Sequence, residues 1–220
     1  MGTLKGLVKN IPLTAGLQRW YGNMMAVQRG TRIIKAIASS PYPQGAAIAH
    51  AVASIGQMPA GGELEDINAI EAQRRKYLSR NDQLVDGTLG DGGLYDNEVT
   101  IREAFGVSKS PKPAIFLYML IRALKPSTVL ELGTNTGISS AFIASALKRN
   151  GEGRVVTLDA SSYRQRLARE MHQNLGLTNV SYVNGLFTDT LDSVLSDMRE
   201  IDLAFIDGHH LYQPTLDYFT

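Results

Sequence analysis

Two acidic residues and the glycine-containing turn between them, in the middle of the chain, have the residue types and spacing of a nucleotide-binding site. Glu131 ends a short apolar run, and a polar turn between Gly133 and Gly137 follows it. Glycines there remove Cβ atoms that would block a ligand, and a helix beginning near Gly137 points unpaired N–H groups at the same place. A carboxylate or a phosphate fits such a place. Asp159 ends the next apolar run, where an acid can bind a ribose diol.

A second group of chemically capable residues follows a later apolar run, in the sequence Asp207-Gly-His-His210. A carboxylate at the end of a parallel strand can coordinate a divalent ion or hold an ammonium group. A histidine with a pKa near 6.5 is suited to proton removal. The alternative is an acid that caps a turn beside two solvated histidines.

The loop spacing discriminates between nucleotide ligands. A dinucleotide fingerprint reads G-x-G-x-x-G, whereas this loop reads E-x-G-x-x-x-G, with Glu131 in place of the first glycine. This pattern, followed by Asp159, resembles motif I and the acidic second strand of class I S-adenosylmethionine (SAM)-dependent methyltransferases. The resemblance covers roughly residues 63 to 220. An NAD-dependent oxidoreductase is the alternative enzyme, and a non-catalytic SAM-binding or membrane- or partner-associated protein is the alternative outside enzymes.

The resemblance implies a set of site residues. Asp-Gly-x-His resembles metal-dependent O-methyltransferases that act on sugars and natural products, which makes Asp207 a Mg²⁺ ligand and His210 the general base, with His209 weaker. The metal requirement is left open. The residues implied to bind SAM are Glu131, Gly133, Thr134, Asn135, Gly137, Ser139, Asp159, Gly185, Phe187 and Asp207.

The elements that must position these residues alternate between strand and helix patterns, which predicts an α/β fold with a Rossmann-like doubly wound parallel sheet. The fourth strand is expected beside the first. Strands are predicted at 129–132, 154–159, 179–183 and 201–206, and helices at 46–55, 63–78, 100–105, 114–124, 138–147, 161–175 and 190–198. His172 is expected to face solvent. Only about four of the family's seven strands are present, so we expect a chain truncated at its C-terminus.

The regions outside the sheet divide the chain further. We expect a basic helical N-terminal segment at 1–62, a helical and flap region at 63–126 and the SAM-binding domain at 127–220. The Gly- and Asp-rich stretch 81–97 lacks the EF-hand spacing. By resemblance it follows an I-E-x-x-R-R helix and forms a flap over the substrate site.

Composition limits the class of protein. The chain has 220 residues, 44% hydrophobic and 20% charged, with no cysteine, which is typical of a globular domain and excludes disulfides and thiolate metal sites. Residues 1–62 contain six Lys and Arg and no acid, leaving −5 for the remainder. Packing on its own domain is the favoured role of this segment, and peripheral contact with an anionic membrane is the alternative. We expect a cytoplasmic homo-oligomer with a small-molecule or sugar hydroxyl substrate and no nucleic acid partner.

Overall fold

The computed structural model describes residues 30–54, 57, 59–83, 99–108, 110–208 and 212–218. The chain separates into two compact units, residues 1–49 and 50–220. In the first unit, residues 30–38 are helical and α3 (Gly45–Ser54) begins. The domain boundaries predicted at residues 62 and 126 stay predictions. Among the described helices, none is long and apolar enough to cross a membrane.

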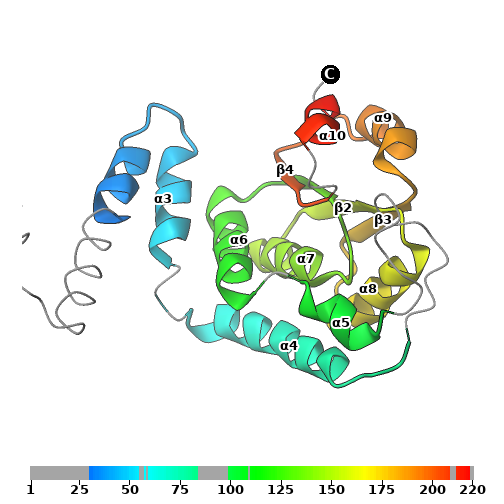
Figure 1. Cartoon of the computed structure of the whole chain (residues 1–220). Helices are drawn as coiled ribbons and strands as arrows, with labels where there is room; N and C mark the ends of the chain where they lie inside the picture. Colours follow the sequence, from blue (N-terminus) through cyan, green and yellow to red (C-terminus); the bar gives the residue numbers. More distant parts are fainter. Residues whose placement is uncertain are drawn as a thin grey trace, which may run out of the picture. The chain divides into compact units, whose positions relative to one another are not determined.

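The second unit is built on a parallel sheet of four strands in the order β3-β2-β1-β4 (Figure 1). The strands are β1 (Thr128–Leu132), β2 (Arg154–Asp159), β3 (Val180–Asn184) and β4 (Leu203–Ile206). The chain adds β2 and β3 on one side of β1 and then returns to place β4 on the other side. The order therefore reverses next to β1, and ligands of open α/β sheets bind where the carboxyl ends of the strands meet at such a switch point. The predicted fold class and the place of the fourth strand are confirmed.

Helices cover both faces of this sheet (Figure 1). The helices of the unit are α4 (Gly61–Leu78), α5 (Ile101–Gly106), α6 (Pro111–Leu124), α7 (Ile138–Asn150), α8 (Ser162–Asn174), α9 (Phe187–Asp197) and α10 (Tyr212–Asp217). Residues of α4 to α8 form one hydrophobic cluster with Val129 and Val155. Leu130 and Leu132 point to the opposite face and pack with α9. The alternation along β1 therefore buries both faces, as a doubly covered parallel strand requires.

Local signals explain where several elements start. Thr100 and Glu103 form a capping box at α5, and the Ser161 hydroxyl accepts a hydrogen bond from the backbone of Arg164 at the start of α8. Helix α9 starts at Phe187, one turn before the predicted start at residue 190. Strand β4 starts at Leu203 and not at residue 201, and just before it the Asp202 carboxylate accepts the N–H groups of residues 127 and 128.

Candidate functional site

The carboxyl ends of the strands bring the predicted site residues to one edge of the sheet. The N–H groups of Gly133 and Thr134 both donate to the carbonyl of Leu158 on β2, at 2.9 and 3.0 Å. On the other side of β1, the N–H of Asp207 donates to the carbonyl of Leu132 at 2.9 Å. The β1–α7 loop is therefore held between the ends of β2 and β4.

The two loop glycines are required by contacts within the protein. Both have a positive φ, 104° at Gly133 and 82° at Gly137. A Cβ on Gly133 would lie 2.7 Å from the carbonyl oxygen of Asp207, and one on Gly137 would lie 2.6 Å from the Cβ of Ala168. These glycines allow close packing of the loop on β4 and α8. The expectation that they also clear Cβ atoms from the path of a ligand stays a prediction.

Helix α7 presents its N-terminus at this edge. Its N-cap residue is Gly137, which offers no side chain to cap the first N–H groups, and no acid stands in the first turn. Ser139 lies in that turn and is 8% exposed. The first N–H groups of a helix have no partner within the helix, and they favour an anion. This arrangement suits a carboxylate or a phosphate.

Asp159 is joined to the loop through its carboxylate. One carboxylate oxygen accepts the N–H of Asn135 at 2.6 Å, and the other accepts the N–H of Ser161 at 2.9 Å. Asn135 has a left-handed backbone, with φ 45°, and its side-chain oxygen accepts a hydrogen bond from the buried Arg164 at 2.7 Å. The Asp159 carboxylate thus binds the middle of the short loop that leads into the N-terminus of α7.

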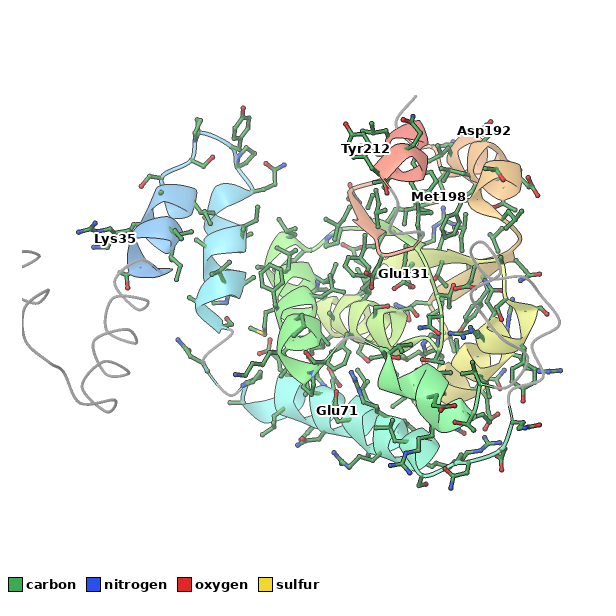
Figure 2. The ribbon with its side chains drawn as sticks, viewed as in Figure 1. Lys35, Glu71, Glu131, Asp192, Met198 and Tyr212 are labelled. Carbon is green, nitrogen blue, oxygen red and sulfur yellow. The ribbon has the colours of Figure 1, made fainter. Side chains whose placement is uncertain are left out.

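Glu131 lies beneath the loop with no exposed surface, in the interior of the unit (Figure 2). The Thr157 hydroxyl donates to its Oε2 at 2.5 Å, whereas its Oε1 makes no hydrogen bond of normal geometry to the described residues. Burial raises the pKa of Glu131 to about 7, opposed by the nearby hydroxyls of Ser139, Thr157 and Ser140 and reinforced by the charge of Asp207. The carboxyl therefore titrates near neutral pH, and its position suits support of the loop better than direct contact with a ligand.

The ends of β3 and β4 complete the edge. The N–H of Gly185 donates to the carbonyl of Asp159 at 3.1 Å. Phe187 packs so closely on Gly208 that a Cβ there would lie 2.7 Å from its ring. Asp207 is partly exposed. The structure therefore brings Gly185, Phe187 and Asp207 to the same edge as the loop, while His209 and His210 lie outside the described residues, as does most of the predicted flap.

His172 is a residue that the sequence analysis placed wrongly. It is 1% exposed, and its Nε2 lies 2.8 Å from the carbonyl oxygen of Gly137. The sequence holds a signal for this buried position, because Gln165, Ala168 and His172 are spaced i, i+3 and i+7. Residues at this spacing lie on one face of a helix, and here that face of α8 is buried. The Gln165 amide on that face donates to the carbonyl of Val183 at 2.7 Å and also lies near Thr134.

The sequence predicts Asp207 as a magnesium ligand. Across the residues described, no three His, Asp, Glu or Cys side chains gather as ligands. The magnesium site stays a prediction, because His209 and His210 lie outside the described residues.

Known proteins that match this chain in sequence are methyltransferases. Residues 130–220 match the family model described as a methyltransferase domain. The chain is 31% identical over 115 residues to the catechol O-methyltransferase of Niastella koreensis, covering 51% of this chain and 50% of that protein. It is 27% identical over 116 residues to tapetum-specific methyltransferase 1 of Arabidopsis thaliana, covering 50% and 49%. The chain thus spans about half the length of the curated relatives it matches.

Solved methyltransferase structures also resemble the chain. The O-methyltransferase from Bacillus cereus in complex with SAH is 24% identical, with a TM-score of 0.44, covering 72% of this chain and 60% of that one. The SAH-bound Podospora anserina methyltransferase PaMTH1 is 18% identical, with a TM-score of 0.48, covering 77% and 60%.

Proposed function

We propose that this protein binds SAM and methylates a hydroxyl group of a small molecule or sugar, because residues 130–220 match the family model described as a methyltransferase domain. The observation that carries the proposal is the β1–α7 loop, which joins the uncapped N-terminus of α7 to the carboxylate of Asp159. SAM carries a carboxylate on its methionine portion and a diol on its ribose. The N-terminus of α7 and the Asp159 carboxylate offer complementary groups to these two parts of the ligand.

In the proposed complex, each described residue has one task. The first N–H groups of α7 and the Ser139 hydroxyl bind the carboxylate of the methionine portion. Asp159 accepts hydrogen bonds from the ribose hydroxyls, as acids at the end of the second strand do in nucleotide-binding sheets. Gly185 and Phe187 lie beside the adenine. Asp207 binds the ammonium group of the methionine portion, and Glu131 supports the loop from below.

The protein contributes two things to the reaction, which are the position of the acceptor and the removal of its proton. When bound, SAM supplies a methyl group on a sulfonium sulfur, and the C–S bond breaks as the C–O bond to the acceptor forms. The protein holds the acceptor hydroxyl in line with that bond and removes its proton. We assign proton removal to His210, on the resemblance of its motif. A neutral imidazole can accept that proton.

Direct binding tests the proposal. Titration calorimetry should show that the protein binds SAM and its demethylated product S-adenosylhomocysteine (SAH). Asp159→Ala should weaken SAH binding by about 1–3 kcal/mol, since charged hydrogen bonds are lost. Asp192→Ala removes an equal charge from an exposed position of α9 (Figure 2) and should leave the affinity unchanged.

The same titration addresses the alternative ligand. An oxidoreductase would bind NADH in preference to SAM, a result that overturns the proposal. The family match does not favour that alternative. The acceptor is then sought by incubating the protein with labelled SAM and a panel of hydroxylated compounds, with and without magnesium. A cytoplasmic location, a homo-oligomeric state and membrane contact of residues 1–62 stay predictions of the sequence.

A further inference from the structure

His172 connects the candidate loop to two other elements of the fold. Its Nε2 lies 2.8 Å from the carbonyl oxygen of Gly137, and its Nδ1 lies 2.5 Å from the hydroxyl oxygen of Tyr182 on β3. The imidazole is completely enclosed between α8, the loop and the sheet. His172 is not among the residues proposed to bind SAM.

The partners of His172 determine which ring nitrogen carries the hydrogen. The carbonyl oxygen of Gly137 can only accept, so Nε2 must donate. Nδ1 then carries the lone pair and accepts the hydroxyl hydrogen of Tyr182. Burial lowers the pKa of His172 to about 4, opposed by the bond to Gly137, so the ring is neutral at physiological pH. The Arg169 guanidinium, 4.0 Å from the centre of the Tyr182 ring, adds a positive charge nearby.

The bond to Gly137 has a geometric consequence at the start of α7. The same carbonyl oxygen also accepts the N–H of Ala141 at 2.9 Å, which is the first bond of the helix. Two donors on one oxygen hold the peptide plane between Gly137 and Ile138 in one orientation. Because a peptide is planar, the direction of the Ile138 N–H is set with it. That N–H belongs to the first turn, whose donors have no partner within the helix.

We infer that His172 is a positioning residue of the cofactor site, whose Nε2–H holds the Gly137–Ile138 peptide so that the Ile138 N–H points at the ligand carboxylate. This inference rests on the proposed SAM site. His172 touches neither the cofactor nor the acceptor, and it acts by arranging a donor before the ligand arrives. Such prearrangement strengthens binding because the donor loses little freedom when the ligand binds.

Replacing His172 by glutamine or by asparagine distinguishes a hydrogen-bonding role from a space-filling role. The amide nitrogen of glutamine stands as many bonds from Cβ as Nε2 of histidine does, whereas that of asparagine corresponds to Nδ1. His172→Gln therefore keeps a donor for Gly137, and His172→Asn loses it. His50→Gln changes an exposed histidine of α3 and serves as the matched control.

Calorimetric titration of the full chain with SAH provides the test, with circular dichroism confirming that each variant is folded. The native protein, His172→Gln and His50→Gln should bind with affinities within about threefold of one another. His172→Asn should bind about tenfold more weakly, the effect of one lost hydrogen bond. Native affinity in His172→Asn, or an equal loss in His172→Gln, would overturn the inference. Failure of the native protein to bind SAH would instead overturn the proposed function, and this inference with it.

A measurement without ligand checks the geometry independently. Long-range ¹H–¹⁵N spectra distinguish the two neutral tautomers of histidine, and the His172 signals are those missing from His172→Gln. We expect hydrogen on Nε2 and a lone pair on Nδ1 at pH 7. Hydrogen on Nδ1 alone, or a charged ring at that pH, contradicts the inference whether or not SAH binds.

Discussion

The buried carboxyl of Glu131 predicts how the stability of the protein depends on pH. Its pKa rises from an ordinary 4.5 to about 7, chiefly because burial disfavours the charged form. The folded state therefore holds this proton more tightly than the unfolded chain does. Below about pH 4.5 both states are protonated and the group has no effect on stability. As the pH rises toward 7, the free energy of unfolding falls, and above 7 the loss stays constant.

The two pKa values determine the size of the effect. The separation of the folded and unfolded pKa values corresponds to a total decrease of about 3 kcal/mol in the free energy of unfolding. About 2–3 kcal/mol of this decrease develops between pH 5 and pH 8. Glu131→Gln cannot ionise, yet its amide oxygen still accepts the Thr157 hydroxyl. Relative to the native protein, this variant should therefore gain about 2–3 kcal/mol of stability over that interval.

Urea unfolding at pH 5, 6, 7 and 8 measures this directly. The native protein and Glu131→Gln are compared at each pH, together with Glu152→Gln, which removes a carboxylate from an exposed position after α7. The Glu152→Gln profile should run parallel to that of the native protein. If the Glu131→Gln profile runs parallel as well, the carboxyl does not titrate in this interval and the reasoning from its burial is refuted.

Four further predictions concern Gly137 of the loop, His210 and Asp207 of the proposed mechanism, and the N-terminal segment. Gly137→Ala should lower the free energy of unfolding by about 2–4 kcal/mol, because a left-handed backbone is strained and its Cβ meets Ala168 and His172. Gly151 also has a left-handed backbone, but nothing lies within 4 Å of a Cβ added there. Gly151→Ala should therefore lower the free energy of unfolding by only about 1–2 kcal/mol in the same urea titration. With an accepted substrate, His210→Ala should reduce kcat by about 10²- to 10⁴-fold at unchanged SAH affinity, and native kcat in that variant would exclude His210 as the base. Asp207→Asn should weaken SAH binding if the carboxylate holds the ammonium group, whereas loss of kcat alone, together with inhibition by excess chelator, would point to a metal ion. If residues 1–62 contact membranes, sedimentation with anionic liposomes should require them and weaken with added salt, and equal sedimentation of a chain starting at residue 63 would leave only a packing role.

Much of the fold follows from local patterns in the sequence. β2 begins and ends at the predicted residues 154 and 159, and the strand of β1 and the start of α7 follow from an apolar run, two glycines and a helical repeat. The place expected for β4 beside β1 is confirmed by the strand order, whereas right-handed connections alone would also allow β4 at the free edge of β3. The sequence by itself therefore determined the architecture and the edge at which Asp159 and Asp207 lie.

Only the tertiary structure decided how the residues at that edge act on one another. The missing Cβ of Gly137 is required by Ala168 and His172, which come from a helix about 30 residues later in the chain. Glu131 loses all contact with solvent, and this follows from the helices packed over its strand and not from its own neighbours in sequence. The pKa of a group and the direction of a peptide N–H depend on distances between segments far apart in the chain. A local pattern carries no information about such distances, so the buried roles of Glu131 and His172 emerged only from the folded protein.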